Sequence, residues 1–277
     1  MIKRPNSRVN LDKTIERVFG KYEQSMEVRS IMANAIVAQL LPGAVVKGGT
    51  SLKLRYGRSK TRVTMDLDMA CRIDSARFVD ELNQRLATGW CGFAGKIIPR
   101  SPATPKGVPE AYVMHPYGVK LTYLGQSWCT VDLELGFNEI GDADDADYVL
   151  SSEIAELFEA LSFPTPDKVP LMKLEHQVAQ KLHGVTEPGS RRAHDLIDLQ
   201  LIFEHSRVDL SLLNKTCTRL FAYRKRHPWP AKVVKGPDWE TLYAEENLKT
   251  SLSRSLDEAI EWVNHLIDEI TATNESF

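Results

Sequence analysis

Two aspartates one residue apart, Asp66 and Asp68, are the first side chains in this sequence whose type and spacing could do chemistry. They belong to an alternating segment, 65–73, that predicts a β-strand. Residues two apart on a strand project to the same side, with backbones about 6.6 Å apart at a rise of about 3.3 Å per residue. Two such carboxylates can bind a hard cation such as Mg²⁺. Because aspartate is disfavoured within strands, we favour this interpretation over a solvated strand face.

A second acidic strand could complete a metal site. Segment 128–137 predicts a strand with Asp132 and Glu134 on one face. Three carboxylates on neighbouring strands can hold two metal ions about 3.5 to 4 Å apart, one activating a hydroxyl and one stabilising a triphosphate. Asp132 is the favoured third ligand because its side chain is as short as the other two. Glu134 is the alternative, and a solvent-facing edge strand would explain both residues without a metal.

A double glycine stands upstream of the aspartates. Gly48 and Gly49 follow a short apolar strand, 44–46, and open a predicted helix in which Thr50 and Ser51 add hydroxyl donors. Backbone N–H groups at such a helix start can approach an anion, and the helix dipole favours negative charge there. The spacing matches neither a Walker A loop nor a Gly-x-Gly-x-x-Gly turn. Taken alone, the turn could be ordinary structure.

The elements that must position these residues follow from hydrophobic periodicity. The first part of the chain mixes both periods, and beyond residue 162 the pattern becomes helical. We therefore predict an N-terminal α/β domain, 1–163, followed by a helical domain, 164–277. Besides the segments named above, the predicted helices are 12–23, 26–41, one starting at Asp74 or Ser75, 168–185, 191–206, 210–227 and 252–272; the predicted strands are 93–98 and 112–123; Pro/Gly-rich or irregular connectors are 99–109 and 228–239.

Composition excludes several classes of protein. The chain has 277 residues, 43% of them hydrophobic, and a formal net charge of -2, which is ordinary for a globular protein. No apolar run approaches the ~18 to 20 residues that a membrane helix needs, so we expect a cytoplasmic protein without membrane association. The four cysteines lack Cys-x-x-Cys spacing and the histidines lack His-Glu-x-x-His spacing. Zinc ribbons, disulfide frameworks and zincin sites are therefore disfavoured.

Together the motifs resemble a known family. The segments KGGTSLKLRYG and DLDMACR, followed by KLEHQVAQKLHG and RRAHDLIDL, resemble the AbiEii toxin family, the nucleotidyltransferases of type IV toxin-antitoxin systems in the polymerase-beta-type superfamily. The resemblance covers residues 45–203. It implies an α+β, two-lobed nucleotidyltransferase fold, with a mixed β-sheet and flanking helices in the N-terminal lobe and an α-helical C-terminal lobe.

The resemblance also assigns roles in the first domain. It implies that Asp66 and Asp68 are catalytic metal ligands. It implies that the segment 48–51, together with Lys53, holds the triphosphate of an NTP. The cofactor would be Mg²⁺ at a two-metal site, with Mn²⁺ as the alternative ion.

In the helical domain the family's catalytic lysine and acidic pair fall on Lys181 and on Asp195 with Asp198. Helical spacing places Lys181 on a polar stripe with Lys173, where a cation could neutralise charge developing on phosphates. A solvated face or a salt bridge within the domain is the alternative. The sequence departs from the family where an arginine usually precedes the first aspartate, because His194 stands there.

The implied activity is transfer of a nucleoside monophosphate from an NTP to RNA, with the 3' end of tRNA as the favoured acceptor. The enzyme would be a toxin of the nucleotidyltransferase class, EC 2.7.7, controlled by a cognate antitoxin encoded nearby. Two alternatives stay open. One is nucleotidylation of a protein hydroxyl or kinase-like phosphotransfer, and the other is a catalytically silent nucleotide- or RNA-binding module.

Two clusters of basic residues could contact RNA. One stands just after the double glycine, and the other lies in the C-terminal half with aromatic residues interleaved. Phosphate neutralisation and base stacking are what RNA binding requires, although a solvated charged face is the alternative. The clusters are Lys53, Arg55, Arg58, Lys60 and Arg62, and then Arg219, Arg224, Lys225, Arg226, His227, Lys232 and Lys235 with Tyr223, Trp229 and Trp239.

Overall fold

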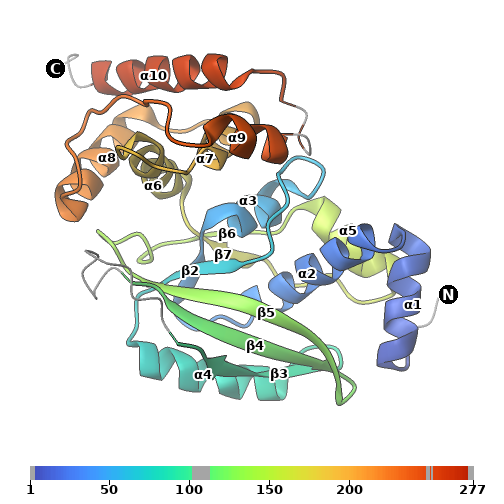
Figure 1. Ribbon diagram of the computed structural model, residues 1–277. Coiled ribbons are helices and arrows are strands. Elements are labelled where there is room, and N and C mark those ends of the chain that lie inside the picture. The colour runs from blue at the N-terminus through green and yellow to red at the C-terminus, as the bar shows by residue number, and fades with distance from the viewer. Residues whose placement is uncertain (1–3, 102–112, 248–249, 251, 274–277) are drawn as a thin grey trace. The chain divides into compact units, whose positions relative to one another are not determined.

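The computed structural model describes residues 4–101, 113–247, 250 and 252–273 (Figure 1). Contacts divide the chain into two units, one of residues 1–57 and 64–171 and the other of residues 58–63 and 172–277. The sequence analysis placed the division after residue 163. Most of the predicted connector 99–109 lies outside the described residues.

The first unit is built on a mixed sheet with the strand order β3-β4-β5-β2-β1-β7-β6 (Figure 1). Near its middle, β2 pairs antiparallel with β1 and parallel with β5, while β1 also pairs parallel with β7. The predicted α+β class with a mixed sheet is confirmed. The strands are β1 (Ala44–Val46), β2 (Leu67–Cys71), β3 (Phe93–Pro99), β4 (His115–Tyr123), β5 (Gln126–Phe137), β6 (Asp147–Val149) and β7 (Val169–Leu171).

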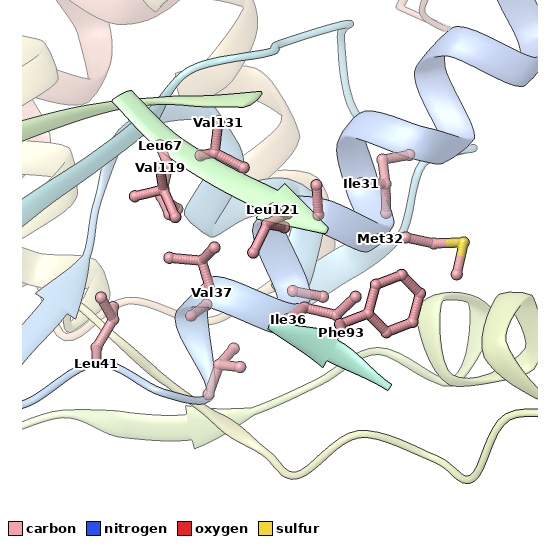
Figure 2. Close-up of a cluster of buried hydrophobic side chains, with 14 of the residues drawn as sticks. Ile31, Met32, Ile36, Val37, Leu41, Leu67, Phe93, Val119, Leu121 and Val131 are labelled. Carbon is pink, nitrogen blue, oxygen red and sulfur yellow. The ribbon is translucent and has the colours of Figure 1, made fainter. Parts of the chain in front are cut away.

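Helices pack on this sheet through an apolar core. Helix α2 is buried along most of its length and contacts β5, and α4 contacts β3. The helices are α1 (Arg8–Phe19), α2 (Glu23–Ala38), α3 (Gly48–Tyr56), α4 (Ser75–Thr88) and α5 (Ser152–Ala160). Figure 2 shows part of the core, where side chains of α2, β4 and β5 lie together: Ile31, Met32, Ile36, Val37, Val119, Leu121 and Val131. The core supports β2 and β5, the strands that carry the acidic residues.

The second unit is helical, as the periodicity predicted. Helix α6 contacts α7 and α8, and α10 contacts α7, α8 and α9. The helices are α6 (Leu174–Thr186), α7 (His194–His205), α8 (Leu210–Arg224), α9 (Trp239–Asn247) and α10 (Leu256–Ala272). A capping box between Ser255 and Glu258 starts α10 by satisfying backbone N–H groups at its N-terminus. Over the described part of the chain, no helix is both long and apolar enough to cross a membrane.

The segment that joins the two units differs from its predicted structure. The sequence analysis predicted one helix over 168–185, but Val169 and Leu171 belong to β7, and α6 begins only at Leu174. Leu171 pairs with Val46 of β1 and with Asp147 of β6. A strand of three residues is too short to show its own period, so only these distant partners reveal it. Strand β6 and helices α5 and α9 were likewise not predicted.

Candidate active site

The Gly-Gly turn lies against the first acidic strand. Pairing of β1 with β2 directs the Lys47 N–H to the Asp68 carbonyl at 2.9 Å, and α3 starts at the next residue. Gly48 has φ +67, and a Cβ built on it would collide with the Asp68 carboxylate oxygen Oδ2. Glycine is therefore required here for its backbone conformation and for the close approach. The start of α3 and the Asp68 carboxylate are direct neighbours.

The hydroxyl and lysine residues of α3 have packing partners. The Thr50 hydroxyl donates to the Asp66 carbonyl at 2.5 Å, and Ser51 is fully buried. Lys53 is 2% exposed, and its ammonium lies 3.0 Å from Glu27 of α2. These predicted NTP-binding residues thus hold α3 in place. Gly48 is the partly exposed member of the predicted set, so an anion would meet the turn at its backbone.

Three carboxylates at β2 and β5 lie near enough to interact electrostatically. Asp66 is exposed and stands one residue before β2, while Asp68 lies within β2 and is half-buried. In the parallel pairing of β2 with β5, Asp68 is opposite Glu134. Burial and then the negative charges of Asp68 and Asp66 raise the pKa of Glu134, and Lys47 acts in the opposite direction. Glu134 therefore shares one electrostatic environment with both aspartates.

Asp132 has another partner. It pairs with Gly118 across β4–β5, and its Oδ1 lies 2.5 Å from Nη2 of Arg100. The sequence analysis favoured Asp132 over Glu134 as the third ligand because of side-chain length. The strand register instead places Glu134 opposite Asp68, so the geometry favours Glu134. Metal binding by Asp132 stays a prediction.

Lys47 is a site residue that the sequence analysis missed. A Cβ built on Gly136 of β5 would lie 3.0 Å from the Lys47 Nζ. The ammonium therefore lies over the strand that carries Glu134, two residues away. The sequence could have indicated Lys47 by its position directly before the Gly-Gly pair. That its ammonium lies over β5 is visible only in the tertiary structure.

The acidic group fits a divalent cation. Burial first, and then the negative charges of Asp68 and Asp66, raise the pKa of Glu134, and a bound cation would offset the part that comes from the two charges. Carboxylate oxygens are the ligands that Mg²⁺ prefers. Among the described residues, no three His, Cys, Asp or Glu side chains are already gathered tightly enough to form a metal cage.

The helical unit holds a separate, buried charge network. Lys181 Nζ lies 3.2 Å from Asp195 Oδ1 and 2.6 Å from Asp198 Oδ2. Arg62 donates to both Asp198 oxygens at 2.9 and 3.3 Å, and Arg192 Nε lies 2.6 Å from Asp195 Oδ2. Both carboxylates are at most 1% exposed, and Lys181 is 4% exposed. The three residues assigned to catalysis in this unit are therefore together.

The network keeps both carboxylates ionised. Burial alone would raise their pKa values, but Arg192 and Lys181 lower the pKa of Asp195 further than burial raises it. The pKa of Asp198 is also lowered, since Lys181 and Arg62 outweigh its burial. Lys181, predicted to face phosphates, thus has two carboxylate partners. Arg62 and Arg192 are the other two cations of this network. The link between Arg62 and Asp198 was not predicted from the sequence.

His194 is another part of this network. Its Nε2 lies 3.6 Å from Asp195 Oδ1, and burial lowers its pKa despite that carboxylate. The neutral ring therefore stands where the family pattern carries an arginine. Arg192, two residues earlier, supplies the cation for Asp195 instead.

Comparison with known proteins decides the family. The family model described as nucleotidyl transferase AbiEii toxin, type IV TA system, matches residues 30–274. The chain belongs to the AbiEii nucleotidyltransferase toxin family. This AbiEii protein is therefore a nucleotidyltransferase toxin of a type IV toxin-antitoxin system, with a nucleotide substrate and an antitoxin partner. Among curated proteins, none matches the chain.

Solved structures share the fold at low sequence identity. The nucleotidyltransferase toxin MenT4 of Mycobacterium tuberculosis is 17% identical, with a TM-score of 0.53 and coverage of 95% of this chain and 98% of that one. A putative nucleotidyltransferase from Helicobacter pylori is 17% identical, with a TM-score of 0.49 over 92% and 98%. JHP933 of the same organism is 16% identical, with a TM-score of 0.48 over 92% and 94%. The likeness to MenT4 supports the nucleotidyltransferase fold of this AbiEii protein.

Replacement of Gly48 tests the close approach of the turn to Asp68. We expect Gly48→Ala to abolish nucleotidyl transfer, because the new methyl group must displace the Asp68 carboxylate. The matched control is Gly125→Ala, whose φ is +78 but whose added Cβ meets nothing within 4 Å. Both variants carry a backbone cost of about 1–2 kcal/mol, which urea unfolding measures. Equal activity of the two variants would contradict the proposed contact.

The pH dependence of stability tests the placement of Glu134. Its pKa is raised in the folded protein, so the associated stability is present below the ordinary pKa and is lost as pH rises through the folded value. Without metal, Glu134→Gln should therefore gain stability relative to wild type as pH rises from 4 to 7, about the titration range of a carboxyl group. Urea unfolding across this range measures it. Asp132→Asn is the control, and a gain as large in that variant would contradict the assignment.

Removing one cation from the Lys181 network should be strongly destabilising. Lys181→Met leaves two buried carboxylates with one cation fewer, and breaking a buried ion pair costs about 3–5 kcal/mol. The control, Lys215→Met, removes an exposed lysine of α8 and should change stability by less than about 0.5 kcal/mol. Urea unfolding compares the two variants. A Lys181→Met protein of wild-type stability that lacks activity would instead place Lys181 on the substrate.

Proposed function

We propose that this toxin transfers a nucleoside monophosphate from an NTP to an RNA hydroxyl with Mg²⁺, and that the 3' end of tRNA is the favoured acceptor. The observation that carries the proposal is the convergence of Asp66, Asp68 and Glu134 beside the start of α3. Mutually repelling carboxylates suit a divalent cation, and the backbone of the Gly-Gly turn suits a phosphate.

In the proposed reaction the acceptor oxygen bonds to the α-phosphorus, the bond from that phosphorus to the bridging oxygen breaks, and pyrophosphate leaves. Asp66, Asp68 and Glu134 would hold Mg²⁺, which supplies Lewis-acid stabilisation of charge on the phosphates. Backbone N–H groups at the start of α3 orient the triphosphate. A carboxylate oxygen of Glu134 could accept the hydroxyl proton. Lys47 adds positive charge beside this group.

RNA as acceptor is supported by exposed cations in the helical unit. Lys225 and Arg226 follow α8 and Lys232 lies in the next connector, all of them exposed, whereas Lys235 is paired with Glu240 and Asp257. In a chain with a formal net charge of -2, such clustering favours a polyanion. Lys53, which was predicted to contact RNA, is instead buried beside Glu27.

The decisive measurement uses each NTP labelled at the α-phosphorus, with Mg²⁺ and total RNA. We expect label in RNA from wild type, a loss of at least about 100-fold in Asp66→Asn and Asp68→Asn, as for other groups that stabilise transition-state charge, and little change in Asp144→Asn. Label in protein would instead indicate protein nucleotidylation. Label only from γ-labelled NTP would indicate phosphotransfer, and binding without turnover would indicate a silent module.

A further inference from the structure

A cavity of about 470 Å³ lies in the helical unit, where α8 ends and the chain turns back. Thr218 and Ala222 of α8 line one side, and Lys225, His227 and Trp229 line the other. This volume is in the range of small-ligand sites. The cavity is formed within the helical unit and shares no residue with the acidic group of β2 and β5.

Aromatic rings form its floor. Phe221 is buried, and its ring centroid lies 5.1 Å from that of Trp229 and 4.9 Å from that of His227. Trp229 is half-exposed, and its Nε1 donates to the Asn214 Oδ1 at 2.9 Å, which fixes the orientation of the indole. An oriented, partly exposed indole is a surface on which a nucleobase can stack.

His227 is held in place beside these rings by a contact with α6. His227 Nε2 lies 2.8 Å from the Thr186 hydroxyl, while its Nδ1 is buried and has no hydrogen-bond partner among the described residues. Buried polar atoms are rarely left unsatisfied. Because this atom is closed off from solvent, His227 contributes its ring to the cavity and not a hydrogen bond to a ligand.

The surroundings of the cavity are positive. Lys225 and Arg226 are exposed, and Arg226 Nε lies 2.9 Å from the Glu187 carboxylate. The neighbouring His183 contacts both Phe221 and His227, and burial together with the charge of Arg224 lowers its pKa to about 3. A positive rim around an aromatic floor matches a phosphate attached to a base.

We propose that this cavity binds one unpaired nucleotide of the RNA acceptor, with the base on Trp229 and the adjacent phosphate at Lys225. The proposal rests on the RNA acceptor of the proposed function and adds where that RNA is held. An acidic protein segment would use the cations but not the oriented indole. Trp239, also predicted to stack on RNA, is excluded because it is 1% exposed and donates to the Ser190 carbonyl.

Two variants test the positive charge and the open volume of the cavity separately. Lys225 has φ 52, a left-handed conformation that asparagine tolerates, so Lys225→Asn removes the charge with little backbone strain. Ala222 is exposed on α8, so Ala222→Trp fills the cavity without disturbing the core. The matched controls are Lys215→Asn and Leu212→Trp, at exposed positions of the same helix that do not line the cavity.

Binding is measured by fluorescence polarisation with a labelled, unstructured RNA oligonucleotide, without NTP, so that no turnover is needed. We expect each cavity variant to bind about 10-fold more weakly, as for loss of one base stack or phosphate contact, and each control to bind as wild type does. Lys225→Asn should also reduce the slope of log K against log salt by about 0.7.

Three results would overturn the proposal: wild-type affinity in both cavity variants, equal binding of an abasic oligonucleotide, or equal competition by polyglutamate. The last would indicate an acidic protein partner. Failure of the proposed function is a separate result, because it appears as absence of label transfer by wild type. Weakened RNA binding in the cavity variants would stand even then.

Discussion

The pairing of β2 with both of its neighbours is the constraint on which the acidic group depends. Pairing with β1 brings Gly48 against Asp68, and pairing with β5 brings Glu134 opposite the same aspartate. Leu67 and Met69, which flank Asp68, are completely buried and attach the strand to the core. Because side chains alternate along a strand, a slip of one residue would bury the carboxylate and expose the leucine. Core packing of Leu67 and Met69 thus fixes the strand register that places Asp68 opposite Glu134.

Carboxylates are close to like charges in one unit of the chain and are paired with cations in the other. On β2 and β5 like charges are left close together, and the pKa of Glu134 rises. In the helical unit cations outnumber the buried carboxylates that they contact, and the pKa values of Asp195 and Asp198 fall. The cation proposed for β2 and β5 would relieve the repulsion there, whereas the buried carboxylates of the helical unit are compensated by cations at a large desolvation cost. The same residue types therefore take different roles.

Arg62 shows how the chain connects these two arrangements. It lies in the segment 58–63, between α3 and β2 in sequence, yet that segment belongs to the helical unit. Its guanidinium makes two hydrogen bonds to Asp198, in the network that also holds Lys181. The short stretch of chain between the Gly-Gly turn and Asp66 is therefore anchored by a buried ion pair rather than left as a loop.

Local sequence pattern alone predicted many of the secondary-structure elements of this protein. The β1 strand, the glycine that opens α3, the Asp74 cap of α4 and most helices followed from periodicity and capping, which depend on near neighbours in the chain. The family resemblance, together with the spacing of Asp66 and Asp68, indicated the nucleotidyltransferase class. Helix ends were predicted less well, since they depend on packing as well as on local residues.

Only the tertiary structure decided which distant side chains meet. Whether Asp132 or Glu134 faces Asp68 depends on the register of two strands more than sixty residues apart, which side-chain length cannot reveal. Whether Lys53 and Lys181 face solvent or carboxylates depends on partners from other helices. Strand β7 exists only because β1 and β6 lie beside it. In each case the deciding energy comes from a contact between segments that the linear pattern does not relate.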